Sequence, residues 1–499
     1  TGRALGGRPD AMRVAFVSAE AAPWAKTGGL GDVVGSLPSA LRRVDENLEV
    51  VVFLPLYERV RTKLKEKGIE PELTDIKIGA RLFDRPEMGF IRTWRDPDGV
   101  LWAFVEHHGF YHRKGLYGDD KSAFFDNVAR FAFLCRAALD SASRLLGGEV
   151  DVFHCHDWHT GPLPMYLKTR YAPALPRTRC VMTIHNLGYQ GNSGKEVLPG
   201  LGLPWSLFDS SVAEFYDHLN LLKGGVACAD ATTTVSPTYA REMLTEEGGI
   251  GLNGFLAARA RRFRGILNGL GPEQRSPHSD PNLIANYDVE NIAGKHKCRE
   301  ALLAETRLRT NYGEPVLGVV SRFVGQKGLD LVADIVPALP VLGAKLVVLG
   351  SGSPNLERRF HELAARFPRH LAVRTGFDPE LANRIYAGSD IFLVPSRFEP
   401  CGLTQLQSMA YGTIPVVRAV GGLRDTVLDP RHFGPRATGF VFFDLSPAAL
   451  YQALARAVHT YRNEPRIWRA IQRNGMERDA TWETSAKQYV HLYNEILWS

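Results

Sequence analysis

The feature that most constrains the fold is a repeated order of a short apolar segment, a glycine-containing turn and a helical segment. It first appears at residues 13–18, an apolar block that is followed by a helical pattern over residues 31–41. An apolar block without alternation predicts a strand that is covered on both faces. Further strands are predicted over residues 50–54, 150–154, 178–184 and 231–235. Alternating strands and helices predict a doubly wound parallel sheet.

The same order begins again in the second half of the chain. Strands are predicted over residues 315–321, 345–350, 371–375, 390–395 and 414–417, with a helix over 329–339. The segment 265–283, rich in Gly, Pro, Ser and Asn, lies between the two series and is typical of a linker or hinge. The predicted fold class is therefore α/β, with two Rossmann-like doubly wound domains that face each other across a ligand-binding cleft.

Domain boundaries follow from these two series. At about 150 residues per domain, 499 residues suggest about three domains, but two large α/β domains fit equally well. We predict a first domain over 12–267, a second over 268–480, and a C-terminal helix over 481–499 that crosses back to the first. Residues 1–11 are interpreted as a disordered tail or a remnant of cloning or processing.

Composition excludes several classes of protein. With 44% hydrophobic and 23% charged residues, the chain is not disordered, fibrous or a coiled coil. Its apolar runs fall below the roughly 18 residues of a membrane span, so no membrane association is expected. The six cysteines form no Cys-x-x-Cys pair, which indicates a reducing compartment and argues against structural zinc. A net charge of +6 suits a small anionic ligand better than a nucleic acid, and we interpret the basic run Arg259, Arg261, Arg262 and Arg264 as a solvated helix face.

Two segments that follow predicted strands carry glycines or cations suited to a phosphate. In residues 26–32 (KTGGLGD), glycines allow backbone N–H groups to approach an anion, and Lys26 adds a charge. The segment matches neither the P-loop nor the Gly-x-Gly-x-x-Gly spacing, so a plain tight turn is the alternative. In residues 321–328, Arg322 and Lys327 could stabilise a diphosphate leaving group without a metal, the alternative being two solvated surface cations.

A third segment, residues 395–404, joins a predicted strand to a predicted helix. Backbone N–H groups of Gly402 to Thr404 are expected to face a phosphate, and Glu399 is placed to accept hydrogen bonds from sugar hydroxyls. The alternative for Glu399 is an ordinary acidic residue at a helix start.

The segment 153–159 (FHCHDWH) resembles a metal site only superficially. Alternation along a strand places His154 and His156 on one face and Cys155 on the other, whereas a catalytic zinc prefers three convergent ligands. We therefore predict no metal here and interpret the segment as a strand end that leads into an active-site loop. Residues 96–99 (DPDG) are predicted to form a turn rather than an Asp-x-Asp metal site.

Together, these motifs resemble the bacterial glycogen synthase and plant starch synthase family. The resemblance runs from about Met12 to the C-terminus and rests on segments 26–32, 156–159, 183–187, 234–240, 321–328 and 399–404, in the order of the family. It implies a GT-B fold and a metal-independent, cofactor-free transfer of glucose from ADP-glucose to the non-reducing end of an α-1,4-glucan, with retention of configuration. It also implies that the first domain binds the acceptor and the second the nucleotide sugar.

The resemblance also implies roles for individual residues, carried over by position. The implied catalytic residues are Lys26, Asp32, Asp157, His185, Arg322, Lys327 and Glu399. Donor binding is implied for Lys26, Gly28, Gly29, Asn186, Asn268, Arg322, Lys327, Gly352, Phe377, Cys401, Gly402, Leu403 and Thr404. Acceptor binding is implied for Tyr117, Asp157, Trp158 and Tyr189.

Three positions differ from the pattern of the family. Relatives usually have Asn-Gly-Ile-Asp followed closely by Trp in the hinge, whereas this chain has Asn268-Gly269-Leu270-Gly271, with Arg275 near the place of the Trp. Residues 191–195 (GNSGK) lack the aromatic residues that relatives often carry after the His-Asn motif, a difference that concerns acceptor binding. Phe377 stands where relatives often carry Tyr, and either ring offers a face to adenine.

For the mechanism we predict front-face substitution, because no carboxylate is marked by its context as a nucleophile. The departing diphosphate oxygen, stabilised by Arg322 and Lys327, would help to deprotonate the incoming hydroxyl. The expected partners are ADP-glucose, ADP and an α-1,4-glucan such as glycogen, starch or a malto-oligosaccharide. A GT-B transferase that uses UDP-glucose and a weak or inactive glucan-binding homologue are the alternatives. The expected compartment is a bacterial cytoplasm, or a plastid stroma or amyloplast; the oligomeric state is left open.

Overall fold

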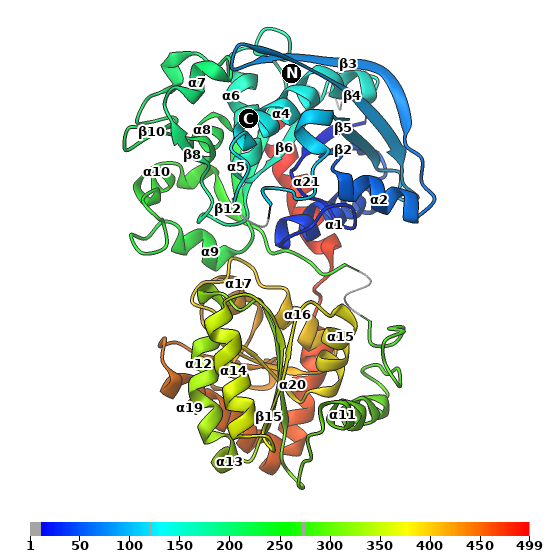
Figure 1. Ribbon diagram of the computed structural model, residues 1–499, viewed down its shortest axis with the longest axis vertical. Coiled ribbons are helices and arrows are strands. Elements are labelled where there is room, and N and C mark those ends of the chain that lie inside the picture. The colour runs from blue at the N-terminus through cyan, green and yellow to red at the C-terminus, as the bar shows by residue number, and fades with distance from the viewer. Residues whose placement is uncertain (1–10, 120–121, 272–275, 499) are drawn as a thin grey trace, which may run out of the picture. The chain divides into compact units, whose positions relative to one another are not determined.

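The computed structural model describes residues 11–119, 122–271 and 276–498, which form two compact units (Figure 1). The first unit comprises the residues up to Val235, Ala240–Ile266 and the segment from Trp482 onward; the second comprises Ser236–Tyr239 and Leu267–Thr481. Two of these boundaries lie one residue from those that the sequence predicts. The sequence did not predict that Ser236–Tyr239 belongs with the second unit. Residues 1–10 of the predicted tail lie outside the described residues.

The first unit is built on a mixed sheet. Within the described residues it has nine strands in the order β12-β11-β7-β6-β1-β2-β5-β4-β3. The strands are β1 (Arg13–Val17), β2 (Glu49–Pro55), β3 (Glu72–Leu82), β4 (Arg85–Arg95), β5 (Leu101–Glu106), β6 (Val152–His156), β7 (Arg179–Ile184), β11 (Ala231–Thr234) and β12 (Phe263–Gly265). A smaller sheet has the order β8-β10-β9, from β8 (Asn192–Gly194), β9 (Glu214–Phe215) and β10 (His218–Asn220).

The expectation of a purely parallel sheet is wrong at one edge of the first unit. β3 and β4 form an antiparallel hairpin, and β4 also pairs antiparallel with β5. Phe83 and Asp84 join the hairpin with φ of 49° and 60°, the left-handed backbone that a two-residue hairpin turn requires. Along β3 buried and exposed residues alternate, because only one face of this edge is covered. β3 therefore lacks the continuous apolar block that predicts the buried strands.

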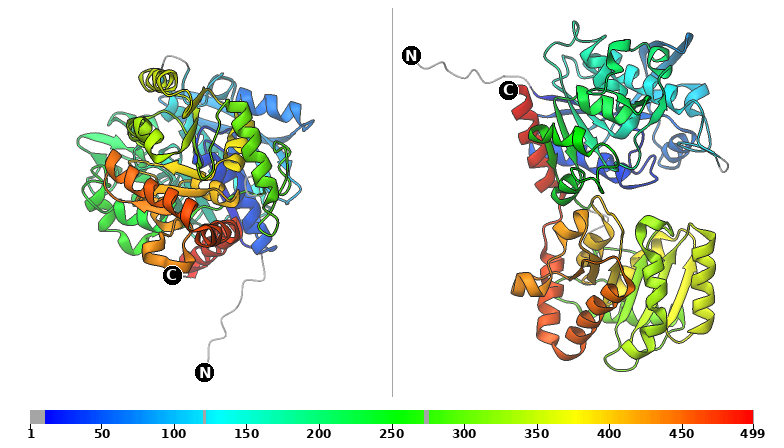
Figure 2. Two further views of the ribbon diagram at one scale, coloured as in Figure 1. Left: turned by 90° about the horizontal axis from the view of Figure 1, so that it is seen from below. Right: turned by 90° about the vertical axis from the view of Figure 1, so that its left-hand side faces the viewer.

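Helices cover the remaining faces of the first unit. They are α1 (Gly29–Val44), α2 (Glu58–Glu66), α3 (His108–Tyr111), α4 (Asn127–Leu145), α5 (Asp157–Thr160), α6 (Pro162–Lys168), α7 (Val197–Gly200), α8 (Leu221–Cys228), α10 (Asn253–Ala257) and α21 (Trp482–Trp498). Helix α9 (Pro237–Glu242) spans the boundary between the units after Tyr239. The last helix, α21, packs against α1, so the C-terminal segment returns to the first unit (Figure 2). Its buried side, which includes Tyr489, Leu492 and Tyr493, is the apolar side that the sequence predicts.

The basic run near residue 260 does not form a helix face, so that expectation is wrong. Arg261 and Arg262 lie in a short 3-10 turn (Ala260–Arg262), and Phe263 begins strand β12. Arg264, within that strand, forms an ion pair with Glu495 of α21. The run therefore bends directly into the edge of the sheet.

The second unit has a parallel sheet with the order β15-β14-β13-β16-β17-β18. Its strands are β13 (Val316–Val320), β14 (Lys345–Gly350), β15 (Leu371–Thr375), β16 (Ile391–Val394), β17 (Ile414–Arg418) and β18 (Phe440–Phe442). Its helices are α11 (Ala293–Thr306), α12 (Leu329–Ile335), α13 (Leu339–Leu342), α14 (Pro354–Arg366), α15 (Pro379–Gly388), α16 (Thr404–Ala410), α17 (Gly421–Thr426), α18 (Pro430–Phe433), α19 (Pro447–Asn463) and α20 (Pro465–Glu477).

This second sheet is buried on both faces, as its continuous apolar strands predict. In β14, Leu346 and Val348 pack into one core with α12, α14 and α19. Val347 and Leu349 point to the opposite core with α11 and α15. Figure 1 shows these two groups of helices on the two sides of the sheet. The period of two along a strand produces this division.

Each sheet has a point where the strand order reverses. β1 lies between β2 and β6, and β13 lies between β14 and β16. Loops that leave the carboxyl ends of strands on either side of such a point diverge, and the gap between them is where α/β proteins bind ligands. The sequence motifs lie at these ends: residues 26–32 and Asp157 follow β1 and β6, whereas Arg322 and residues 395–404 follow β13 and β16.

Within the residues that the structure describes, no helix combines the length and the apolar character that a membrane span requires.

Candidate functional site

The glycine-containing segment after β1 is held in place by a buried carboxylate. Glu20 accepts hydrogen bonds from the backbone N–H and the hydroxyl of Thr27 at 2.5 and 2.6 Å, and from the backbone N–H of Gly28 at 3.3 Å. Lys26 donates to Asp32 at 2.6 Å across the same turn. A Cβ added at Gly28 or Gly29 would meet no atom within 4 Å, so the backbone is open on that side. Glu20 therefore fixes the backbone of residues 27 and 28, while the turn stays open to a ligand beside Gly28 and Gly29.

Asp157 is the buried carboxylate at the end of β6. Its φ is 56°, an uncommon conformation for a residue other than glycine and one that is found at functional sites. The carboxylate accepts the backbone N–H of His185 at 2.7 Å. Burial raises the pKa of Asp157 to about 7, while the N–H groups of His185 and Asn186 act in the opposite direction. The group is thus poised to change its protonation state near neutral pH.

His185 lies directly after β7, beside Asp157. Its ring Nε2 is 3.0 Å from Nδ1 of His156, and burial lowers the pKa of His185 to about 3. The imidazole is consequently neutral at physiological pH. Asn186, the next residue, accepts the backbone N–H of Gly188 with its side-chain oxygen at 2.9 Å.

Aromatic residues surround this buried group. Tyr117 donates its hydroxyl to Glu20 at 2.6 Å and stacks on His159 with ring centroids 4.9 Å apart. Trp158 packs against the backbone of Gly191, where an added Cβ would lie 2.6 Å from the indole. Tyr189, in contrast, is 62% exposed. The structure therefore brings Tyr117 and Trp158 into the same packed region and leaves Tyr189 at the surface.

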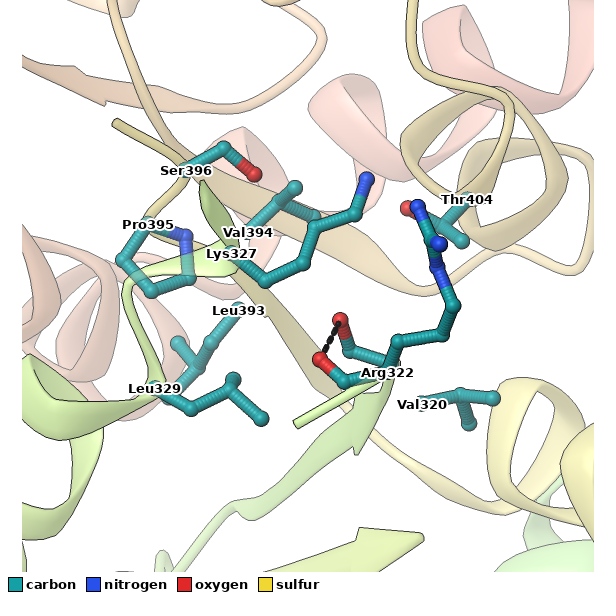
Figure 3. Close-up of a pocket in the computed structure, with 10 residues that line it drawn as sticks. Val320, Arg322, Lys327, Leu329, Leu393, Val394, Pro395, Ser396 and Thr404 are labelled. Carbon is teal, nitrogen blue, oxygen red and sulfur yellow. Dashed lines mark hydrogen bonds between the residues drawn. The ribbon is translucent and has the colours of Figure 1, made fainter. Parts of the chain in front are cut away.

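The second unit has a cavity of about 190 Å³ at the reversal point of its sheet (Figure 3). Its polar lining comes from Ser321, Arg322, Lys327, Ser396 and Thr404, and the Ser321 hydroxyl is bonded to the carbonyl of Arg322 at 3.3 Å. Figure 3 shows that Arg322 and Lys327 extend their charged ends toward the side of the cavity where Ser396 and Thr404 lie. Among the described residues, none accepts a hydrogen bond from the Arg322 guanidinium. Two cations and two hydroxyls converging on one small cavity suit a diphosphate.

Glu399 closes one side of this arrangement. Its Oε2 accepts hydrogen bonds from Lys327 at 2.6 Å and from Ser396 at 2.8 Å. The backbone behind it requires glycine: a Cβ at Gly421, where φ is 42°, would lie 2.0 Å from the carbonyl oxygen of Glu399. The backbone N–H of Gly422 donates to that same carbonyl at 3.1 Å. The loop after β16 is thus seated on the start of α17.

Gln405 holds the backbone of residues 401–404 in place. Its amide nitrogen donates to the carbonyl of Gly402 at 2.8 Å and to that of Cys401 at 3.2 Å. Gly402 has a φ of 71°, so a larger residue would strain the turn. Burial raises the pKa of the Cys401 thiol to about 12, and this group is therefore not a nucleophile at neutral pH. Leu403 directly precedes Thr404, where α16 begins.

Asn268 lies beside this loop in the second unit. It is 8% exposed, and its side-chain oxygen is buried without a hydrogen-bond partner in the described chain. A buried amide oxygen without a donor is costly, so a ligand hydroxyl would compensate it. Its backbone donates to the sulfur of Cys401, which joins the two predicted donor-binding positions.

The two remaining predicted donor residues differ in their surroundings. Phe377 follows β15 and is 92% exposed, so its ring is available for stacking. The backbone N–H of Gly352 already donates to Glu357 at 2.8 Å, and a Cβ there would lie 2.5 Å from the carbonyl oxygen of Phe323. Gly352 therefore serves close packing between two chain segments, and its N–H is not open to a ligand in this structure.

The altered hinge is well packed where the structure describes it. Leu270 is fully buried against Leu406 and Met409, and its backbone N–H donates to the carbonyl of Ala480 at 2.7 Å. Arg275 lies outside the described residues. Leu270 thus ties the chain that enters the second unit to the chain that leaves it.

The suspected metal ligands are arranged as the alternation predicts. His154 and His156 stack on one face of β6 with centroids 4.4 Å apart, while the sulfur of Cys155 lies 3.7 Å from that of Cys180. In the part of the chain that the structure describes, no three His, Cys, Asp or Glu side chains cluster as a metal site. The turn predicted at residues 96–99 is confirmed, with the N–H of Gly99 bonded to the carbonyl of Asp96 at 2.9 Å. All six cysteines are unpaired thiols.

Sequence reasoning missed the residues that support these groups, above all Glu20, His156 as a partner of His185, and Gln405. It also missed that Ser236–Tyr239 belong to the second unit, where Ser236 donates to the carbonyl of Pro400 at 2.6 Å and Thr238 donates to Asp425. An acid three residues after a strand, such as Glu20, was the one available signal. Nothing in the sequence indicated its partners.

Comparisons with known proteins cover nearly the whole chain. Residues 13–258 match the model of the starch synthase catalytic domain, and residues 304–474 match that of the glycosyl transferases group 1. The glycogen synthase of Anaeromyxobacter dehalogenans strain 2CP-C is 46% identical over 488 residues, which cover 97% of this chain and 100% of the relative. The glycogen synthase of Thermodesulfovibrio yellowstonii is 39% identical over 497 residues, which cover 97% of this chain and 98% of the relative.

Two solved structures are similar as well. The catalytic domain of starch synthase IV from Arabidopsis thaliana, bound to ADP and acarbose, matches with a TM-score of 0.87 and 32% identity. This match covers 98% of the present chain and 100% of the other. A sucrose-phosphate synthase from Thermosynechococcus elongatus has a TM-score of 0.60 and 19% identity, which shows a shared fold only.

Proposed function

This chain belongs to the glycogen and starch synthase family of glycosyltransferases with the GT-B fold, and from this membership we propose that it elongates an α-1,4-glucan with glucose from ADP-glucose. The observation that carries the proposal is the cavity at the end of β13 and β16, where Arg322 and Lys327 meet Ser396 and Thr404. A nucleotide sugar needs its diphosphate bound and its leaving oxygen stabilised, and these side chains offer both.

The second unit would bind the donor. Arg322 and Lys327 would hold the diphosphate, and Phe377 would stack on adenine with its exposed face. Glu399 and Asn268 would contact hydroxyls of the transferred glucose. The unpartnered oxygen of Asn268 supports this role, because a sugar hydroxyl would supply its missing donor. Residues 401–404, held by Gln405, would line the glucose and the phosphates.

The first unit would position the acceptor and the transferred sugar. Lys26 and the backbone of Gly28 and Gly29 would approach the donor, with Asp32 holding Lys26 in place. His185 and Asn186 would contact the glucose. Asp157 would lie near the attacking hydroxyl, and Tyr117, Trp158 and Tyr189 would bind the glucan chain.

The proposed step is a front-face substitution without a metal. The bond between glucose C1 and the diphosphate oxygen breaks, and a bond between C1 and the 4-hydroxyl oxygen of the glucan forms on the same face. The proton of that hydroxyl passes to the departing diphosphate oxygen, so ADP leaves. Arg322 and Lys327 stabilise the negative charge on the diphosphate, and the neutral His185 adds no competing charge beside the sugar.

The proposal is tested by supplying the purified chain with labelled ADP-glucose or UDP-glucose and glycogen, and measuring polymer-bound label. We expect incorporation from ADP-glucose with release of ADP, and no added requirement for a divalent cation after chelation. Preference for UDP-glucose would replace the donor assignment. Binding of glycogen without incorporation from either donor would indicate an inactive glucan-binding homologue.

A further inference from the structure

A column of buried histidines lies beneath His185 in the first unit. His156 is completely buried at the end of β6, and its Nδ1 lies 3.0 Å from Nε2 of His185. On its other side the ring stacks on His154 at 4.4 Å, and Phe16 lies parallel at 5.7 Å. His154 is in turn bonded to Tyr493 of α21 at 2.7 Å and to Thr183 at 2.6 Å.

Every ring in this column is neutral. Burial lowers the pKa of His185 and of His154 to about 3, and it lowers that of His156 well below its ordinary value. A neutral imidazole has one N–H and one bare nitrogen. The state that remains to be decided is therefore which nitrogen of each ring carries the proton.

The contact between His156 and His185 allows two arrangements. In the first, Nε2–H of His185 donates to Nδ1 of His156, which forces the proton of His156 onto its own Nε2. In the second, Nδ1–H of His156 donates to Nε2 of His185, and Nε2 of His156 remains bare. In the second arrangement the proton of His185 must be on Nδ1.

The surroundings of His156 distinguish these arrangements. Its Nε2 is buried and has no hydrogen-bond partner in the described chain. The first arrangement would bury an N–H donor without an acceptor, whereas the second buries only a lone pair. Buried donors without a partner are the rarer and costlier case. The second arrangement is therefore the more stable.

We propose that His156 is a positioning residue that fixes His185 with its proton on Nδ1, so that His185 offers a hydrogen-bond donor to the substrate. No described residue of the protein is bonded to Nδ1 of His185, so that donor is available. This inference rests on the proposed function, in which His185 contacts the transferred glucose: a fixed Nδ1–H donates to a sugar oxygen, and a bare Nδ1 would only accept. A ring free to change tautomer would present the wrong state part of the time.

The direct test is the ¹⁵N spectrum of ring-labelled histidine in the free protein. Protonated and bare ring nitrogens have well separated shifts, and the signals of His185 are assigned by their loss in a His185→Asn variant. We expect a bare Nε2 and a protonated Nδ1 for His185 in the wild type. A proton on Nε2 of His185 would overturn the proposal. Since no substrate is needed, this result is independent of whether the chain transfers glucose.

Variants of His156 supply the kinetic test. His156→Phe keeps a ring of similar shape without a donor, and we expect mixed tautomers of His185 and a kcat about 10- to 100-fold lower, with a smaller change in the KM for ADP-glucose. His156→Asn places an amide nitrogen near the position of Nδ1 and should restore part of kcat and the Nδ1–H tautomer.

The matched control is a variant that removes a contact of His154, the ring on the side of His156 away from His185. Tyr493→Phe removes the hydroxyl that bonds His154 but leaves the contact between His156 and His185 intact. Its kcat should stay close to the wild type even where its Tm falls. Unchanged kcat in His156→Phe, or an equal loss of kcat in Tyr493→Phe, would contradict the positioning role. If His156→Phe does not fold, the wild-type spectrum and His156→Asn still decide the question.

Discussion

The candidate residues of the first unit and those of the second differ in how they use charge. In the first unit, Asp157 and His185 are buried. Burial raises the pKa of Asp157 and lowers that of His185, so it favours the neutral form of both side chains. In the second unit, Lys327 keeps a charged contact with Glu399, and Arg322 is exposed to solvent. A neutral sugar is recognised by directional hydrogen bonds from fixed neutral groups, whereas a diphosphate is recognised by charge. This difference agrees with the proposed roles, in which the first unit contacts the sugar and the second holds the diphosphate.

The largest effect is expected from removing a charge in the second unit. Replacing Lys327 with Ala removes one of the two cations of the cavity, and kcat should fall by more than about 100-fold. Steady-state kinetics with ADP-glucose and glycogen measure it. Arg366→Ala, at the exposed C-terminal end of α14, is the matched control and should leave kcat unchanged. Near-normal turnover in Lys327→Ala would remove this residue from the mechanism.

In the first unit, the buried Asp157 should make kcat/KM depend on pH. Because the pKa of Asp157 is raised to about 7, its carboxylate is lost as pH falls through 7. If the carboxylate is the working form, kcat/KM for the glucan should fall about tenfold per pH unit below 7 and level off above. Asp157→Asn should be slower and lack this dependence. A profile in the wild type that is flat from pH 5 to 8 would be inconsistent with an ionised Asp157.

Titration of Asp157 should affect stability in the opposite direction to activity: the folded protein should lose stability as pH rises. The folded pKa of Asp157 lies above its ordinary value of 3.8, so its favourable contribution is present at low pH and lost as pH rises through about 7. At pH 8, Asp157→Asn should therefore have a Tm at least as high as that of the wild type, even though it is less active.

The smallest expected effect concerns the exposed aromatic of the second unit. Phe377→Ala should raise the KM for ADP-glucose about 5- to 10-fold, since stacking on a base contributes about 1 kcal/mol or somewhat more. Phe377→Tyr should keep the wild-type KM, and neither variant should change Tm, because the ring is 92% exposed. Inhibition by ADP should weaken by the same factor in Phe377→Ala. Equal KM values in all three proteins would place the adenine elsewhere.

Sequence patterns predicted the architecture well where burial is complete. β14 is a continuous apolar block because both faces of its sheet are covered, and it was predicted over its full length. The hairpin of β3 and β4 was missed because one face is exposed and its residues alternate. Motifs also located Arg322, Lys327 and Glu399, since charged and glycine-rich residues after buried strands are conspicuous. Their roles in the reaction stay predictions until they are measured.

By itself the sequence determined the two α/β series, the family to which the chain belongs, and the residue types available for a diphosphate and a sugar. Those properties depend on local pattern and on motifs read along the chain. The tertiary structure alone decided that Glu20 holds residues 27 and 28, that His156 bonds His185, and that Gln405 supports the loop after β16. It alone decided how burial sets the pKa of Asp157 and the neutral state of the histidines. Hydrogen bonds and desolvation depend on neighbours in space: His156 and His185 come from different strands, and Glu20 meets residues 27 and 28 only because the loop after β1 folds back on itself.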